Sequence, residues 1–114
     1  MAPIMFGQTT LKENRELVDE WIPTILSMDL PSLLRFLEVI VTRDSLLDRL
    51  PEIEVPALVL VGAEDRAQPV FRARQIADGI PGASLEIVPR AGHLSALEQP
   101  EAFNRALMNF LSSL

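Results

Sequence analysis

Two stretches decide the fold, VLVGAED (residues 59–65) and PRAGHLSALEQP (residues 89–100). The first leads from a continuously apolar run into Asp65, and the second carries His93, the only histidine of the chain. An unbroken apolar run rich in β-branched residues is typical of a parallel strand that is covered on both faces. Because binding and catalytic groups of open parallel sheets gather beyond the carboxyl ends of the strands, we expect Asp65 and His93 to share one edge of a sheet.

The sequence around these two stretches alternates strand and helix. The expected elements are a strand over 57–61, a helix over 69–78, a strand over 84–88 and a helix from about Pro100. In the helix over 69–78, the inward face carries Ala73, Ile76 and Ala77. Two parallel strands joined through a helix take a right-handed crossover. The pattern therefore predicts an α/β fold with two parallel strands, a crossover helix and a terminal helix.

The chain divides near residue 50, where the apolar period changes from helical to extended. Pro51 and Pro56 frame an extended linker, because proline disfavours helix at its own position and at the one before it. We therefore expect two segments, residues 1–50 and residues 51–114.

The first segment reads as a series of helices. Thr10 and Glu13 predict a capping box at a helix start. The apolar face of that helix consists of Val18, Trp21, Ile22 and Ile25. A second helix is expected to start near Pro31, a residue suited to the first helical turn; it is apolar almost all round, so we expect most of its surface to be covered. A short third helix is expected over 44–50.

Asp65 and His93 are a candidate acid and base. A carboxylate that accepts the Nδ1 hydrogen of an imidazole fixes the tautomer, and Nε2 is then free to take a proton from a hydroxyl nucleophile. Imidazole suits this role because its ordinary pKa lies near neutrality. The two residues therefore predict two members of a Ser-His-Asp triad.

The third member, a nucleophilic serine, is absent from the pattern. A nucleophile elbow reads G-x-S-x-G at a turn from strand to helix, and the glycines at 7, 62, 79, 82 and 92 bracket no serine in that way. Ser84 leads into a strand, which is the wrong context. Ser95 is two residues from His93 and cannot easily present Oγ to the same ring. We therefore expect the nucleophile to lie outside this chain.

Other polar and aromatic side chains have weaker alternatives. Glu64 adjoins Asp65 but is expected to be a solvent or turn residue and not the acid. Glu98 is expected to support the histidine loop through hydrogen bonds to backbone amides near a helix start. Trp21 is a candidate substrate-binding residue and, with Met28, would line an apolar acyl pocket, although an aromatic residue on a helix face is more often part of a core.

The same stretches resemble the C-terminal part of the α/β-hydrolase superfamily. VPALVLVGAED (55–65) is similar to its penultimate core strand and acid turn, and IPGASLEIVPRAGHLSALEQPEAFNRALMNFL (80–111) to its last strand, histidine loop and terminal helix. The Gly92-His93 pair and the Glu98-x-Pro100-x-x-Phe103 spacing are specific features of that loop. Arg66 and Arg90 depart from the usual pattern, and we expect both to be exposed to solvent.

The resemblance implies a division of roles within the chain. Residues 1–50 are similar to the helical cap (lid) segment, and residues 51–114 to the C-terminal part of the core. The implied activity is hydrolysis of an ester, a lactone or a C–C bond, and the closest likeness is to 3-oxoadipate enol-lactonases and esterases. Because the nucleophile and the oxyanion hole are missing, we expect this chain alone to be inactive. The alternatives are one subunit of a split hydrolase and a non-catalytic, self-associating fragment.

Composition narrows the range of partners. The 114 residues carry a net charge of −6 with no basic stripe, so neither nucleic acid nor an anionic membrane is an expected partner. The chain has no cysteine, and it shows no metal-ligand cluster or cofactor motif, so neither a metal nor a cofactor is expected. We expect a cytoplasmic protein that acts on a small-molecule ester or lactone in the complete enzyme. An open strand edge further predicts a homo-oligomer, or pairing with the missing N-terminal half.

Overall fold

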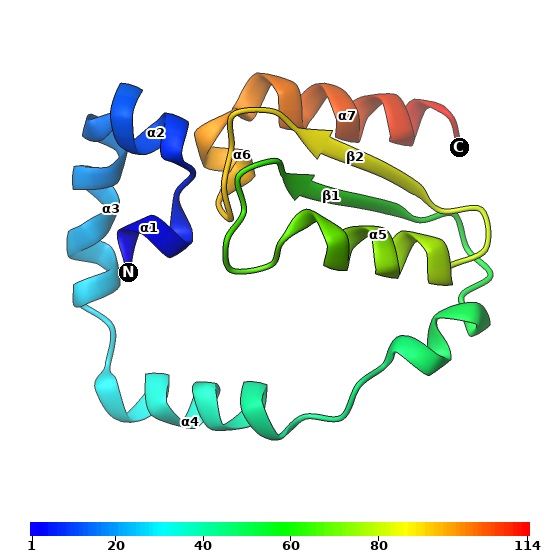
Figure 1. Cartoon of the computed structure of the whole chain (residues 1–114), viewed down its shortest axis with the longest axis horizontal. Helices are drawn as coiled ribbons and strands as arrows, with labels where there is room; N and C mark the ends of the chain where they lie inside the picture. Colours follow the sequence, from blue (N-terminus) through cyan, green and yellow to red (C-terminus); the bar gives the residue numbers. More distant parts are fainter.

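The computed structural model describes residues 1–114 (Figure 1). Its elements, in order, are α1 (Ala2–Met5), α2 (Gln8–Glu13), α3 (Arg15–Leu26), α4 (Leu30–Thr42), the 3₁₀ helix η1 (Leu47–Glu52), β1 (Leu58–Gly62), α5 (Val70–Gly79), β2 (Ser84–Val88), α6 (Ser95–Glu98) and α7 (Pro100–Ser112). The predicted order of strand, helix, strand and helix after residue 50 is confirmed, with each boundary within one residue of the expected one.

The two strands form a parallel sheet with β1 beside β2. The register pairs Leu58 with Ser84 and Gly62 with Val88, so the strands end level with each other. Figure 1 shows α5 on one face of this sheet and α7 on the other. The α/β fold class expected from the sequence is therefore confirmed.

The buried residues of the two strands lie at their carboxyl ends. The burial of β1 increases along the strand, and its last two residues, Val61 and Gly62, are buried. Val88 ends β2 in the same way, and Ala73 of α5 is buried. Ile76, expected on the inward face of that helix, is 37% exposed. Within the sheet, burial is thus concentrated at the edge from which the Asp65 and His93 loops leave, while Phe6 and Val18 are the buried apolar residues of the first segment.

The predicted capping box at Thr10 is wrong. Thr10 lies inside α2 and is buried, and Glu13 is the last residue of that helix. The chain breaks at Asn14, whose backbone has φ −133° and ψ 57°, and the Asn14 side chain accepts a hydrogen bond from Leu17 N at 3.4 Å. Asparagine is among the best residues at this position because its short side chain reaches an unpaired amide of the first turn.

The second predicted helix is present, but its expected cover is not. Asp29 caps α4 by accepting hydrogen bonds from the amide and hydroxyl of Ser32, at 3.0 and 2.7 Å. No residue of α4 is buried, and Phe36 and Val39 are 62% and 61% exposed. In Figure 1 α4 runs apart from the sheet and from the helices α5 and α7 on its two faces. The apolar surface is therefore real, and nothing in these 114 residues covers it.

The overall dimensions agree with this incomplete cover. Only 13 of the 114 residues are buried. The radius of gyration is 15.8 Å, whereas a compact domain of this length has about 13 Å.

The third expected helix, over 44–50, is instead the 3₁₀ helix η1, which includes Pro51. No helix combines the length and the apolar character that crossing a membrane requires.

Candidate active site

Asp65 and His93 meet at the predicted edge of the sheet. Nδ1 of His93 lies 3.0 Å from Oδ2 of Asp65, although the residues are 28 positions apart in the chain. The Asp65 side chain is 6% exposed and that of His93 is 36% exposed. The second carboxylate oxygen, Oδ1, accepts a hydrogen bond from Gln68 N at 2.8 Å. One oxygen is thus fixed by its own turn, and the other is directed at the imidazole.

The ring of His93 is held on one side and open on the other. With Nδ1 protonated, the ring donates to Asp65 and its other nitrogen, Nε2, is an acceptor. Nε2 makes no hydrogen bond within the chain, and the side chain reaches solvent. This arrangement is chemically suited to take a proton from a group that approaches from outside.

Backbone hydrogen bonds join the two loops that carry this pair. Ala63 N donates to Val88 O at 2.9 Å, and Glu64 N donates to Ala91 O at 2.8 Å. A side chain at Gly62 would collide with the backbone of Ala91 and Gly92, so glycine is required there by the close approach of the loops. The strand pairing therefore continues into the loops and fixes their separation.

Arg90 adopts a backbone conformation that favours glycine. Its φ is 58°, the only positive value at a non-glycine residue of the chain. Its carbonyl accepts a hydrogen bond from Gln99 Nε2 at 3.1 Å, and its guanidinium approaches Glu13 at 3.9 Å. The side chain is 69% exposed, as expected for this departure from the family pattern, and Arg66 is exposed as well.

Glu98 supports the histidine loop as the sequence predicts. It is 5% exposed, and Oε2 accepts hydrogen bonds from Gly92 N at 2.9 Å and from Leu94 N at 3.1 Å. The sequence does not predict a further hydrogen bond, in which Oε1 of Glu98 accepts from Gly7 N at 2.7 Å. The two residues are 91 positions apart in the chain.

Glu64 differs from its expected role as a solvent or turn residue. Its carboxylate accepts hydrogen bonds from Thr9 N at 2.7 Å and from Thr9 Oγ1 at 2.6 Å. Both oxygens are therefore engaged by the helical segment, and neither is aimed at His93. Sequence reasoning missed Gly7 and Thr9 because no local pattern marks a contact between residues so far apart in the chain.

A cavity of about 400 Å³ lies beside the Asp65–His93 pair. Its lining comes from β1, α5 and the histidine loop and includes Arg43, Asp65, Gln68, Arg72, His93 and Ser95. Ser95 makes no hydrogen bond to His93, and Ser84 begins β2 at the opposite end of the sheet. Neither serine is therefore placed as a nucleophile.

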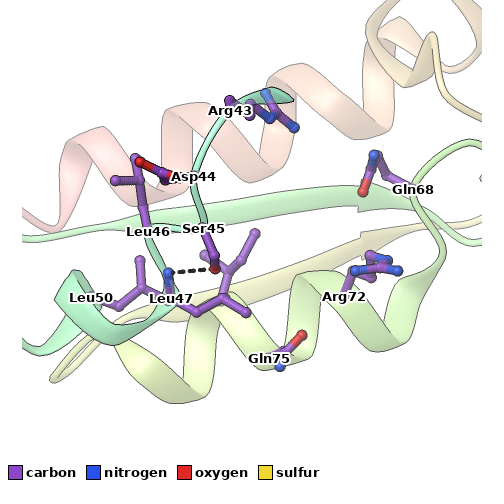
Figure 2. A pocket seen from close by; sticks show the side chains of 10 residues that line it. Arg43, Asp44, Ser45, Leu46, Leu47, Leu50, Gln68, Arg72 and Gln75 are labelled. Atoms are coloured by element: carbon purple, nitrogen blue, oxygen red, sulfur yellow. Dashed lines mark hydrogen bonds between the residues drawn. The ribbon is translucent and has the colours of Figure 1, made fainter. Parts of the chain in front are cut away.

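An adjoining cavity of about 420 Å³ lies between the segment before η1 and α5 (Figure 2). Figure 2 shows Leu46, Leu47 and Leu50 at one end and Gln68 and Arg72 at the other. Arg43, Gln68 and Arg72 line both this cavity and the one beside the pair. These side chains give the surroundings of His93 a polar, cationic side.

A third cavity, of about 630 Å³, is mostly apolar and lies among the helices of the first segment. Its lining includes Met5, Ile25, Met28, Leu33 and Phe36. Trp21 is half-buried on α3 and lines neither this cavity nor those beside His93. Its role as a substrate-binding residue stays a prediction. No cluster of three or more His, Asp or Glu side chains is arranged to hold a metal ion.

Relatives of known name match a little more than half of the chain. A protein of Caulobacter sp. (strain K31), provisionally named as the carbamate hydrolase RutD, is 43% identical over 63 residues, which are 55% of this chain and 24% of that protein. A 2-hydroxy-6-oxononadienedioate/2-hydroxy-6-oxononatrienedioate hydrolase of Cupriavidus pinatubonensis (strain JMP 134 / LMG 1197) is 40% identical over 65 residues, which are 57% of this chain and 22% of that protein. The matched part is thus about a quarter of the length of these relatives.

Solved structures match nearly the whole chain. A thermophilic esterase of Thermogutta terrifontis superposes with a TM-score of 0.92 at 29% identity, over 99% of this chain and 42% of its own. Est816, described as an N-acyl homoserine lactone degrading enzyme, superposes with a TM-score of 0.77 at 27% identity, over 94% of this chain and 43% of its own. The profile of the Alpha/beta hydrolase family matches residues 3–106. The chain is therefore a member of the α/β-hydrolase family, and it spans less than half of the solved relatives that it matches.

Proposed function

We propose that this chain supplies the acid and the base of a Ser-His-Asp hydrolase whose nucleophile lies outside these 114 residues. One observation carries the proposal, the 3.0 Å approach of His93 Nδ1 to Asp65 Oδ2 with Nε2 left free. Asp65 holds the imidazole in the tautomer that makes Nε2 a base, and stabilises the imidazolium that forms. His93 takes the proton of the serine hydroxyl as that oxygen attacks, and returns it to the leaving group.

The substrate class we propose is a small ester or lactone, with a C–C bond cleaved by hydrolysis as the second choice. The names of the relatives support this range, since they include an esterase, a lactone-degrading enzyme and a hydrolase of 2-hydroxy-6-oxo dienedioates. The enol-lactonase likeness seen in the sequence falls within the same range. Substrate choice in such folds depends on the cap and loops and not on the triad, so the fold itself does not narrow it further.

The nucleophile and the oxyanion hole would come from the polypeptide that completes the sheet. Support comes from β1, which pairs with β2 on one edge and has no strand on the other. Further support comes from the cavity beside His93, because Val59, Leu60 and Val61 of β1 line it. A neighbouring strand at this edge would end close to Nε2, where the proton of a serine is needed.

Complementation tests the proposal. The part of the Thermogutta terrifontis esterase that the match leaves uncovered would be fused to or expressed with this chain. We expect turnover of a chromogenic short-chain ester by the complemented protein and none above background by the chain alone. Turnover should vanish in His93→Ala and persist in the control Glu101→Gln, an exposed residue of the first turn of α7. A folded complex without turnover, or turnover that survives His93→Ala, would contradict the proposal.

A second candidate, a non-catalytic module that associates with itself, has its own observation. The bare apolar surface of α4 and the open edge of β1 are both suited to a second copy of the chain. This alternative predicts a stable homo-oligomer and no gain of turnover on complementation. The chain alone is expected to self-associate under either proposal, so turnover on complementation is the measurement that separates the two.

A further inference from the structure

The start of α2 lies between two carboxylates, one from each loop of the Asp65–His93 pair. Gly7 donates to Glu98 of the histidine loop, and Thr9 donates to Glu64, which precedes Asp65. We call residues 7–9 with these two carboxylates the carboxylate clamp. The clamp joins three parts of the chain that lie 55 and 91 positions apart.

Glu98 fixes the backbone on both sides of His93. Oε2 accepts from Gly92 N and from Leu94 N, the amides immediately before and after the histidine. The carboxylate is 5% exposed, so these bonds are sheltered from water. Charge-assisted hydrogen bonds in such surroundings are roughly twice as strong as neutral ones. His93 is therefore anchored through its two neighbours and not only through its ring.

The histidine anchor depends on the helical segment. Glu98 Oε1 accepts from Gly7 N at 2.7 Å, and Leu94 N also lies 3.2 Å from Met5 O. Departure of residues 5–7 would leave a buried carboxylate oxygen without its donor, which is costly in a dry site. The position of the histidine loop is thus tied to the docking of α1 and α2.

Glu64 makes the equivalent connection for the acid. Its two oxygens accept from the amide and the hydroxyl of Thr9, and its own amide donates to Ala91 O in the histidine loop. Asp65 is the next residue, so the backbone that carries the acid is held from both sides. The same turn of the helical segment therefore reaches both members of the pair.

We propose that Glu98 and Glu64 are positioning residues, which hold His93 and Asp65 at hydrogen-bond distance only while α1 and α2 are docked against the two loops. The catalytic meaning of this coupling rests on the proposed function, but the coupling itself is a property of the chain without substrate. Neither glutamate contacts the ring of His93, so both act through the backbone. Withdrawal of the helical segment would turn the pair off without any change in Asp65 or His93.

The tautomer of His93 is the direct test. Because His93 is the only histidine, the nitrogen NMR signals of its ring are identified without further assignment. We expect the wild-type chain to hold mainly the Nδ1-protonated form, and Asp65→Asn to shift the signals toward the other tautomer. Glu98→Gln should move the signals in the same direction as Asp65→Asn does. In Glu98→Asp, which keeps a carboxylate, the signals should lie closer to those of the wild type. The matched control Glu101→Gln, an exposed residue of the first turn of α7, should leave them unchanged.

Thr9→Val is a second variant that tests the inference if Glu98→Gln fails to fold. It removes only the hydroxyl bond to Glu64, and protection of the β1 amides from hydrogen exchange reports whether the sheet persists. With β1 protected, we expect faster exchange at Gly92 and Leu94 and a smaller tautomer shift than in Glu98→Gln. Wild-type tautomer and exchange in Thr9→Val and in a folded Glu98 variant would overturn the inference.

The complemented hydrolase separates this inference from the proposed function. There, Glu98→Gln should lower kcat about tenfold or more with little change in KM, as expected when a base is displaced but substrate binding is kept. If turnover survives His93→Ala while the tautomer still responds to Glu98→Gln, the proposed function falls and the clamp stands. If His93 is essential but neither glutamate affects the tautomer, the clamp falls and the proposed function stands.

Discussion

The histidine loop and helix α4 are opposite cases of how this chain uses its residues. The loop places a glycine, a histidine and a buried glutamate where every buried polar side-chain atom has a hydrogen-bond partner. Helix α4 has a strongly apolar sequence, yet none of its residues is buried. The loop is therefore complete within the chain, whereas the helix is folded but unpartnered.

The difference shows which parts of the fold are specified locally. Hydrogen bonds are directional, so the amides around His93 accept one arrangement of the Glu98 carboxylate. Apolar burial has no direction and needs only a complementary surface, and that surface is absent around α4. This chain can therefore hold the geometry of the Asp65–His93 pair while α4 remains bare.

The largest expected effect is on kcat and concerns the Asp65–His93 pair beside the histidine loop. In the complemented hydrolase, Asp65→Asn should reduce kcat by about 10⁴-fold, since the amide holds the imidazole in the wrong tautomer. That factor corresponds to about 5 kcal/mol of transition-state stabilisation. Steady-state turnover of a short-chain ester measures it, with Asp78→Asn, the same change at an exposed residue of α5, as the control. Retention of most activity by Asp65→Asn would show that another carboxylate orients His93.

The next effect concerns the stability of the loop. Glu98→Ala removes an acceptor of three amides, and two of them, Gly7 N and Gly92 N, have no other acceptor. We expect the free energy of unfolding to fall by about 3 kcal/mol, because each amide left buried without a partner costs about 1–3 kcal/mol. Urea denaturation followed by fluorescence of Trp21, the only tryptophan, measures it. The exposed Glu101→Ala should change stability by less than about 0.5 kcal/mol. Equal stability of the two variants would mean that the hydrogen bonds of Glu98 do not stabilise the histidine loop.

Much of the core half was predictable from sequence because its signals are local. The unbroken apolar run of β1, the alternation in β2 and the prolines at helix starts each act within a few residues. The Asp65–His93 pairing also followed, since parallel strands bring their carboxyl ends to one edge. These signals predict where the pair lies, and the structure places its atoms at hydrogen-bond distance.

The remainder depended on contacts that no local pattern records. The helix break at Asn14 was misplaced to Thr10, because both residue types cap helices and only the packing of Thr10 inside α2 distinguishes them. The links from Gly7 and Thr9 to the glutamates span 91 and 55 positions. Helix α4 was expected to be covered because its composition requires cover, but composition does not state which polypeptide provides it.

The third effect tests the bare end of the comparison. We propose that the chain self-associates through α4 and the open edge of β1, so that light scattering gives a mass above the 12.7 kDa of one chain. Phe36→Glu should weaken that association about 30-fold, because burial of such a side chain contributes about 2 kcal/mol. Gln75→Glu, an exposed position of α5 with the same change in charge, is the control. A monodisperse monomer in the wild type at micromolar concentration would show that the bare surface stays in water.

The smallest effect is a pH dependence at the start of the same helix. Hydrogen bonds from the hydroxyl and then the amide of Ser32 hold the pKa of Asp29 below its ordinary value. Because the folded-state pKa is the lower one, the charged cap stabilises α4 above the ordinary carboxyl pKa, and this contribution is lost as the pH falls through the lowered value. Asp29→Asn keeps a capping oxygen without the charge. Its helical circular dichroism should therefore lose less signal on acidification than the wild type does, while Asp29→Ala should be less helical at neutral pH already. Identical acid titrations of the wild type and Asp29→Asn would show that α4 does not depend on the charge of this cap.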